Sequence, residues 1–400
     1  MTFEALIATA HGQGASDLHL EPGLPAAIRV RGSLRTTGDP LAAQGLVAFA
    51  HEVIGPQVWS QFVERRSVDF SRTIGGVRCR INVMHTSRGI GFAIRLLTSF
   101  QASIERLNLH PDLKKLISPT NGLVLISGPT GSGKSSTLAA LIQEINLTES
   151  RHILTIESPV EYVLRSQRAF VRQREVGRDT PSFEQGLLDA LREDPDVLMV
   201  GEMRDPETMR LTLNAAETGH LVLTTVHSGS CGEALQRVVL AFPSEVQSNV
   251  AAQLADCLVA VVCQRLRFRP DLNLRLPECE ILRSTNSVKA FIRNRDFFKL
   301  PQALETGAEH GMWSFERYQK WMAKRTQWQV PGAVESPPDS VEDPCGETPM
   351  PTAAPSSFSQ DASPALPAPQ PSRGAQHHAG GHIEIEPVEG GLDEVIKRLS

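Results

Sequence analysis

Closely spaced cysteines are missing from this chain of 400 residues. The six cysteines are spread along the sequence, at Cys79, Cys231, Cys257, Cys263, Cys279 and Cys345. No C-x-x-C pair occurs, which argues against a zinc ribbon and against a dithiol redox site. Scattered thiols of this kind are typical of reduced cysteines in a cytosolic protein.

Long hydrophobic runs are missing as well. The longest purely apolar run near the expected helices covers residues 258–263, whereas a transmembrane helix needs ~20 apolar residues. Residues 1–5 also lack the basic start and the apolar core of a signal peptide. We therefore expect a cytoplasmic protein that reaches a membrane only peripherally, through a partner.

A strong positive charge is absent too. The formal net charge is −5, and it is unevenly distributed, because eleven acidic residues face only three basic ones from Thr326 to the end. That stretch carries a net charge of −8, which leaves about +3 for the rest of the chain. Neither balance is that of a nucleic-acid-binding protein, so we expect no direct nucleic-acid partner.

A glycine-rich loop between a strand and a helix is the most specific motif present. Residues 123–127 form a strand-like apolar run, and residues 128–135 fit the pattern G-x-x-x-x-G-K-[ST]. The backbone N–H groups of such a loop bind phosphate together with the positive end of the following helix. We expect Lys134 to contact the β- and γ-phosphates of ATP and Ser135 to ligate Mg²⁺. The residues expected to hold the nucleotide are Gly128, Pro129, Thr130, Gly131, Ser132, Gly133, Lys134, Ser135 and Ser136.

An acidic residue follows a second apolar strand-like run. Residues 197–200 lead through a glycine to Glu202, the form that a Walker B element takes. A carboxylate at this edge of the sheet would lie beside the phosphate loop, where Mg²⁺ and the attacking water need one. The pattern predicts a catalytic and metal-binding Glu202, although buried strands that end in glutamate are also common without such a role.

Two further strand-like runs end in side chains that suit phosphate chemistry. One leads to Glu157, with Glu161 close behind it, and another leads to His227. Carboxylates from neighbouring strand ends suit metal binding and water activation. We expect a catalytic Glu157, and we expect His227 to sense the γ-phosphate. A solvated charge at Glu161 and a structural histidine at 227 are the alternatives.

The pattern of the chain predicts an α/β protein with a mostly parallel sheet in its second part, because strands and helices alternate from residue 121. We expect a first domain over 1–100, a linker over 101–120 and an ATPase domain over 121–328. The composition then predicts a disordered Pro-rich linker over 329–382 and a short amphipathic segment over 383–400, since residues 331–382 contain eleven prolines and almost no large apolar side chains.

The expected elements follow from spacing. The first domain should contain a helix over 2–10 and strands over 17–20, 27–30, 77–83 and 90–97. The second should contain strands over 123–127, 152–156, 197–200 and 221–225, and helices over 134–146, 182–193 and 206–218. A long helix should start at Ser244 and continue through Val261.

Several longer motifs resemble one family closely. The matching segments are 17–20, 23–25, 173–180, 190–196, 201–205 and 215–220. Together they resemble the type IV pilus retraction ATPases, the PilT-like members of the secretion-ATPase (GspE-like) superfamily. The resemblance covers residues 3–322.

This resemblance implies a PAS-like N-terminal domain joined to a RecA-like P-loop domain, assembled as a homo-hexamer. It places Glu157 in the family's Asp box, Glu202 in Walker B and His227 in the His box. It also implies that arginines of the N-terminal domain reach the nucleotide, with solvated strand charges as the alternative role. The arginines of the matching stretch are Arg78, Arg80 and Arg95.

The implied function is a motor that hydrolyses ATP to power pilus retraction, that is, pilin disassembly and twitching motility. The implied partners are an inner-membrane platform protein (PilC-like) and a paralogous PilU-like ATPase, which would hold the protein at the cytoplasmic side of the inner membrane.

Three departures keep other functions open. Ser158 stands where pilus ATPases usually have Asp, and residues 288–295 match the retraction motif only loosely. The Pro-rich tail has no counterpart in the family pattern. The alternatives are an ATPase of a type IV secretion or conjugation system, and a non-hydrolysing ATP-binding partner of another pilus motor. A P-loop metabolic kinase is the remaining enzyme class, but the sequence shows no sign of a lid or a substrate pocket.

Overall fold

The computed structural model describes residues 2–30, 32–97 and 102–330. The expected tail segment 383–400, and all but the first two residues of the expected linker 329–382, lie outside the described residues. The described chain contains two sheets, one on each side of residues 98–101.

The first sheet is antiparallel throughout, with the strand order β3-β2-β1-β6-β5-β4. The elements of this part of the chain are α1 (Phe3–Gly12), β1 (Ala15–Leu20), β2 (Ala26–Val30), β3 (Ser33–Thr37), α2 (Ala43–Arg65), β4 (Ser67–Ile74), β5 (Val77–Thr86) and β6 (Gly89–Leu97). Buried side chains such as Ile7 of α1, Phe62 of α2 and Ile81 of β5 share one core. The expected first helix and its four expected strands are therefore confirmed, whereas β3, α2 and β4 had not been expected.

The second sheet has the order β13-β12-β7-β11-β10-β8-β9, and only β13 runs antiparallel to its neighbour. Its strands are β7 (Gly122–Ser127), β8 (His152–Glu157), β9 (Phe170–Glu175), β10 (Val197–Val200), β11 (Leu221–Val226), β12 (Leu258–Arg269) and β13 (Leu274–Arg283). The helices of this part are η1 (Pro111–Leu116), α3 (Lys134–Thr148), α4 (Phe183–Ala190), α5 (Pro206–Glu217), α6 (Cys231–Leu240), α7 (Gln247–Cys257), α8 (Asn286–Arg293), η2 (Phe297–Lys299), α9 (Leu300–Thr306), η3 (Ala308–His310) and α10 (Phe315–Ala323). The expected α/β class with a mostly parallel sheet is confirmed.

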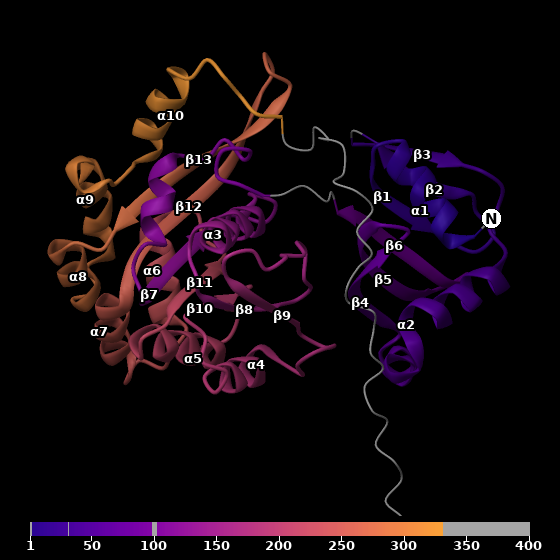
Figure 1. Ribbon diagram of the computed structural model, residues 1–400, viewed down its shortest axis with the longest axis horizontal. Coiled ribbons are helices and arrows are strands. Elements are labelled where there is room, and N and C mark those ends of the chain that lie inside the picture. Colours follow the sequence, from indigo (N-terminus) through magenta and orange to yellow (C-terminus); the bar gives the residue numbers. More distant parts are fainter. Residues whose placement is uncertain (1, 31, 98–101, 331–400) are drawn as a thin grey trace, which may run out of the picture. The chain divides into compact units, whose positions relative to one another are not determined.

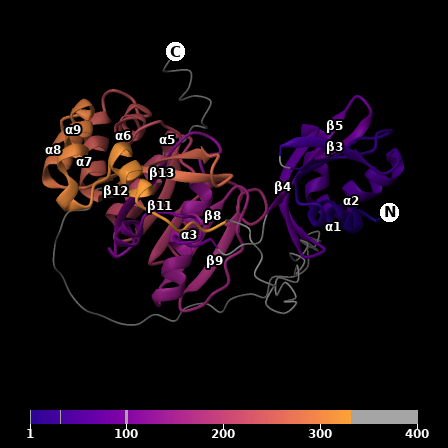
Figure 2. The same cartoon turned by 90° about the horizontal axis from the view of Figure 1, so that it is seen from above.

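Two cores cover the two faces of this second sheet. Leu123 and Leu125 of β7 belong to the core shared with α4 to α9, whereas Val124 and Ile126 belong to the core shared with α3, η1 and α10. Successive side chains of a strand point to opposite faces, so a strand buried on both sides is apolar at every position. Figures 1 and 2 show the helices α6 to α9 gathered beside β12 and β13.

Local sequence explains where the helices that support the site begin. Asp205 caps α5 by accepting a hydrogen bond from the Thr208 backbone N–H at 2.8 Å, and Pro206 occupies the first helical position. Ser182 and Ser230 cap α4 and α6 in the same way. Such caps satisfy N–H groups that have no partner inside the helix.

The helix expected from Ser244 through Val261 is wrong at both ends, because α7 begins only at Gln247 and the last four expected residues belong to a strand. Helix α7 ends at Cys257, and β12 begins at Leu258 and pairs in parallel with β7. A short apolar run with a helical repeat cannot be distinguished from a buried strand by periodicity alone. The valines of this run are β-branched, which favours the strand.

Two boundaries also differ from expectation. Helix α4 ends at Ala190 rather than 193, and Asp194 then takes a left-handed conformation with φ of 54°. The described part of the expected linker contributes Ile104, Leu113 and Leu116 to a core of the second sheet. Among the described helices, none is both long and apolar enough to cross a bilayer.

Candidate active site

The expected site residues come together at one edge of the second sheet. Strands β7, β11, β10 and β8 are parallel neighbours, so their carboxyl ends share one edge. The phosphate loop follows β7, His227 follows β11, Glu202 follows β10 and Glu157 ends β8. A site at the carboxyl ends of the strands is the usual location in open α/β sheets.

The phosphate loop joins β7 to α3 as expected. Gly133 precedes the helix with φ of 86°, in the left-handed region that favours glycine. The Ser132 hydroxyl is buried and has no hydrogen-bond partner within the described part of the chain. A buried hydroxyl without a partner costs free energy unless a ligand or water satisfies it, so this loop is suited to an oxygen-rich ligand.

Lys134 lies across the loop with its ammonium group turned inward. Its Nζ donates to the carbonyl oxygens of Gly128 and Pro129 at 2.9 and 3.0 Å, and only 9% of the residue is exposed. Burial lowers the pKa of Lys134, and the nearby carboxylate of Glu202 opposes that shift. The charge is therefore held at the loop by carbonyl dipoles, which a phosphate oxygen would outcompete as a partner.

His227 links Lys134 to Glu202. Its Nδ1 lies 3.4 Å from Lys134 Nζ, and its Nε2 lies 3.8 Å from the Glu202 carboxylate. Burial lowers the pKa of His227, and the charge of Lys134 lowers it further, so the imidazole is held neutral. The three expected residues of the loop, Walker B and His box thus form one cluster.

Glu157 is almost fully buried beside this cluster. Its Oε1 accepts hydrogen bonds from Thr155 Oγ1 at 2.8 Å and from Gln173 Nε2 at 3.0 Å. Burial raises the pKa of Glu157 to about 7, an effect that Glu161 strengthens and the two hydrogen bonds oppose. A carboxyl group with a pKa near the working pH can exchange a proton with water, as general acid–base chemistry requires.

Glu157 and Glu202 enter the site from adjacent backbone positions. The Gly201 N–H donates to the Ile156 carbonyl at 2.8 Å, directly before Glu157. A Cβ atom added to Gly201 would lie 3.5 Å from the Glu157 Cα. The Thr225 hydroxyl fixes the same turn by donating to the Gly201 carbonyl at 2.8 Å.

The three expected arginines differ in their contacts. Arg80 pairs with Asp69 at 2.6 Å, and Arg95 pairs with Asp17 at 3.1 Å. Arg78 instead donates to the Val160 carbonyl at 3.0 Å, and its Nη2 lies 3.5 Å from the buried Glu175 carboxylate. Arg78 thus contacts the segment that follows Glu157, whereas the ion pairs of Arg80 and Arg95 lie within the first sheet. The Asp69 carboxylate raises the pKa of Arg80, and the charges of Glu161 and Glu202 raise it further.

Several residues of the site carry no expected role. Arg204 Nη2 lies 2.5 Å from the Glu202 carboxylate, and Arg237 donates to the His227 carbonyl at 2.7 Å. Gln173 and Tyr162 support Glu157 and Ser136, since the Tyr162 and Ser136 hydroxyls lie 2.8 Å apart. Arg204 and Gln173 belong to matched motifs, so spacing relative to Glu202 and Glu157 could have signalled them.

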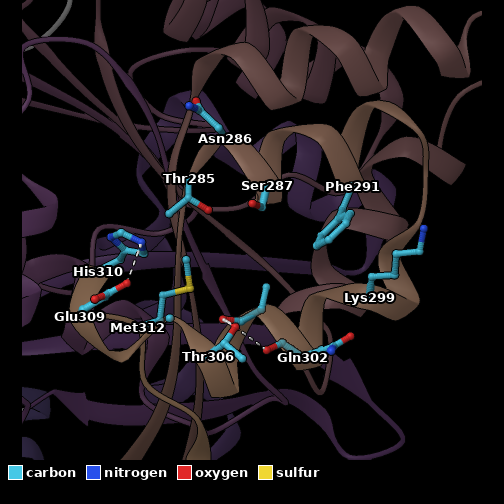
Figure 3. Close-up of a pocket in the computed structure, with 12 residues that line it drawn as sticks. Thr285, Asn286, Ser287, Phe291, Lys299, Gln302, Thr306, Glu309, His310 and Met312 are labelled. Atoms are coloured by element: carbon cyan, nitrogen blue, oxygen red, sulfur yellow. Dashed lines mark hydrogen bonds and ion pairs between the residues drawn. The ribbon is translucent and has the colours of Figure 1, made fainter.

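A cavity of about 610 Å³ lies elsewhere in this part of the chain. Figure 3 shows it between α8, α9 and the segment that follows them, with Phe291, Lys299 and Met312 among its lining residues. It contains none of the residues expected to hold ATP. The chemistry expected from the sequence therefore belongs to the sheet edge and not to this cavity.

The buried Glu157 carboxyl leads to a prediction about stability. Its usual pKa is 4.5 and its folded pKa is about 7, so above pH 4.5 the unfolded chain releases a proton that the folded chain keeps. Stability is therefore lost as the pH rises from about 4.5 to about 7. Glu157→Gln keeps an oxygen that can accept from Thr155 and Gln173 but does not titrate. The variant should exceed the wild type in stability by up to about 3 kcal/mol at pH 8, with little difference at pH 4.5.

Thermal melts of both proteins at pH 4.5 and pH 8 measure this difference. Thr155→Val serves as the control, because it removes one hydrogen bond and leaves the carboxyl group in place. A difference in melting temperature that is the same at both pH values would show that Glu157 titrates normally in the folded protein.

The fold and the site define a P-loop nucleotide hydrolase, and comparison with known proteins agrees. The model of the family described as "Type II/IV secretion system protein" matches residues 2–294. The type IV pilus retraction ATPase PilT of Pseudomonas aeruginosa is 41% identical over 314 residues, which cover 78% of this chain and 91% of that protein.

Two solved structures are similar to this chain. The crystal structure of the pilus retraction motor PilT with bound ADP has a TM-score of 0.71 and 36% identity, and the match covers 80% of this chain and 96% of that one. The Legionella pneumophila ATPase DotB has a TM-score of 0.68 and 27% identity, over 81% of this chain and 96% of that one. The chain belongs to the type II/IV secretion system family and is a PilT-like ATPase.

Proposed function

We propose that this ATPase is a hexameric motor that powers type IV pilus retraction. The cluster of Lys134, Glu202 and His227 at the sheet edge carries the proposal, because it supplies a phosphate-binding cation, a carboxylate and a neutral imidazole in contact range. The motor would disassemble pilin through an inner-membrane platform protein of the PilC-like kind, with a PilU-like ATPase as a further partner. It would therefore work in the cytoplasm, peripherally at the inner membrane.

ATP would lie in the phosphate loop, in the segment 128–136. The fit rests on two observations. The Ser132 hydroxyl is buried and has no hydrogen-bond partner among the described residues, and Lys134 is directed into the loop, where it contacts two carbonyl oxygens and His227. Lys134 would neutralise charge on the transferred phosphoryl group, and the neutral His227 would contact the γ-phosphate.

Mg²⁺ would be held by the Ser135 hydroxyl and the Glu202 carboxylate. Magnesium prefers oxygen ligands and usually takes only one or two from protein carboxylates, with water and phosphate completing its shell. The donor set at this edge fits that preference, since Ser135 is exposed at the start of α3 and Glu202 lies beside Lys134. When bound, the ion would stabilise the negative charge of the phosphates.

Glu157 is the best-placed base for the attacking water. Its pKa of about 7 leaves the carboxyl group able to accept a proton at neutral pH. Arg78 would act on the nucleotide from the first sheet. Its contacts with Val160 and Glu175 support that role. Arg80 pairs with Asp69 but is also within electrostatic range of Glu161 and Glu202, whereas Arg95 pairs with Asp17 in the first sheet.

A type IV secretion ATPase is the second candidate. Ser158 beside Glu157 departs from the pilus pattern, and the family model that matches this chain is described as a type II/IV secretion system protein. Residues 288–295, most of which form α8, match the retraction motif only loosely. These departures bear on which partner the motor works with. They do not affect the residues proposed for ATP binding and hydrolysis, which match the family pattern.

Deletion of the gene in its own organism tests the choice between the two machines. A retraction motor predicts more surface pili and loss of twitching motility, both restored by the wild-type gene and not by Lys134→Ala. Loss of substrate transfer with normal pili and normal twitching would contradict retraction and favour the secretion machine.

The proposed motor should be a closed ring. The subunits of the proposed ring would meet head to tail, and a head-to-tail interface whose rotation closes gives a cyclic oligomer. Light scattering of the purified protein with a non-hydrolysable ATP analogue should give a mass near six chains of 43.7 kDa. Arg78→Ala should lower activity without changing that mass. Full activity in a monomer would contradict the ring.

A further inference from the structure

Gln264 of β12 packs against the phosphate loop, on the side of the loop that faces this strand. Only 2% of the residue is exposed. Its Nε2 donates to the Ser132 carbonyl at 2.7 Å, and its Oε1 accepts from the Thr137 hydroxyl at 2.7 Å. One side-chain amide therefore connects the loop to the first turn of α3.

Gln264 also leaves no room for side chains at the two glycines that flank the loop. A Cβ atom added to Gly128 would lie 2.2 Å from the Gln264 carbonyl oxygen, and one added to Gly133 would lie 2.9 Å from Gln264 Nε2. Both flanking glycines of the motif thus pack directly on this residue. Their lack of a side chain lets the loop lie this close to β12.

The amide is needed in one orientation. Ser132 offers an acceptor and Thr137 a donor, so the contacting side chain must donate on one side and accept on the other. The Cys279 Sγ lies 3.8 Å from the same Oε1. An ionised carboxylate could not donate to Ser132, and a thioether could not donate and accepts only weakly, so an amide fits both contacts.

We propose that Gln264 is a positioning residue that sets the phosphate loop for ATP binding. In a trans peptide the C=O and the next N–H point in opposite directions. The bond from Gln264 turns the Ser132 carbonyl toward β12, and this directs the Gly133 N–H away from β12, toward the bound phosphate. Thr137 fixes the amide that makes this bond. The inference rests on the proposed phosphate-binding role of the loop.

Gln264→Met tests the proposal, because methionine has a similar length and lacks both hydrogen bonds. Without this bond the Ser132 carbonyl is no longer held toward β12, so the Gly133 N–H is no longer held toward the phosphate. Loss of one hydrogen bond to a charged group weakens binding about tenfold. The dissociation constant for a fluorescent ATP analogue and the KM for ATP should rise by about this factor, while kcat changes by less than about threefold. A structural role alone would lower the amount of folded protein and leave KM unchanged.

Thr137→Val provides a second variant in case Gln264→Met folds poorly. It removes the hydroxyl that orients the amide and keeps the shape of the side chain, so KM should rise by about threefold. The double variant should bind ATP no more weakly than Gln264→Met alone, because Thr137 acts on the loop only through its hydrogen bond to Gln264. If the fold-changes in ATP affinity of the two single variants multiply in the double variant, this coupling is contradicted.

Gln253→Met is the matched control. Gln253 of α7 also makes two side-chain hydrogen bonds, to Asn214 at 2.9 Å and Glu217 at 2.7 Å, away from the loop. Its KM should equal that of the wild type. Wild-type ATP affinity in folded Gln264→Met would overturn the positioning role. Unchanged binding in Lys134→Ala, measured in parallel, would instead overturn the proposed phosphate site.

Discussion

Lys134→Ala should lower ATP hydrolysis by about 10²- to 10³-fold. The Lys134 ammonium is held inside the loop by two carbonyl oxygens, and it lies 3.4 Å from His227. Alanine removes this charge from the phosphates while the loop backbone remains. The ammonium is the cation placed to balance charge that develops on the transferred phosphoryl group. The loss should therefore appear in turnover even at saturating ATP.

Phosphate release by the purified wild-type and variant proteins measures this loss. Lys115→Ala is the matched control, because Lys115 is exposed and pairs only locally with Asp112 at 2.6 Å. It should keep wild-type activity. Equal rates for Lys134→Ala and the wild type would exclude the P-loop mechanism for this chain.

Glu202→Gln should separate ATP binding from hydrolysis. The Glu202 carboxylate lies beside Arg204 at 2.5 Å and His227 at 3.8 Å, at the end of β10. An amide keeps its size but is a weak metal ligand and no base, so turnover should fall by about 10²- to 10⁴-fold. The backbone N–H groups and Lys134 still bind the phosphates, and the ring should persist.

Binding of a fluorescent ATP analogue, phosphate release and ring mass are measured on the same preparation. Glu207→Gln is the control, since Glu207 is a partly exposed residue of α5 that pairs with Arg210. It should leave all three quantities unchanged. If Glu202→Gln loses nucleotide binding together with its fold, Glu202 is a structural residue and the proposed assignment is wrong.

The part of the site that could be predicted from the sequence consists of residues that directly follow or end a strand. The strand–loop–helix around residues 122–148, and Glu157, Glu202 and His227 after their strands, are signals that need no knowledge of distant residues. Parallel strands end at one edge, so their meeting follows from the alternation of strands and helices alone.

The role of Gln264 could not be predicted, because no local signal in the sequence indicates it. Its segment has an apolar repeat that fits a helix, and only pairing with β7 decides that Leu258–Arg269 is the strand β12. Its partners Ser132 and Thr137 are more than a hundred residues away in sequence. A hydrogen bond between such distant groups leaves no spacing for a local pattern to detect.

The sequence by itself determined the phosphate loop, the strand-end carboxylates and the α/β class, because each depends on local spacing and on side chains next to one another in the chain. The tertiary structure alone decided which strand supports the loop, that Arg80 and Arg95 pair within the first sheet, and that burial raises the pKa of Glu157 to about 7. Those features depend on which distant residues pack together and exclude water, and that packing exists only in the folded chain.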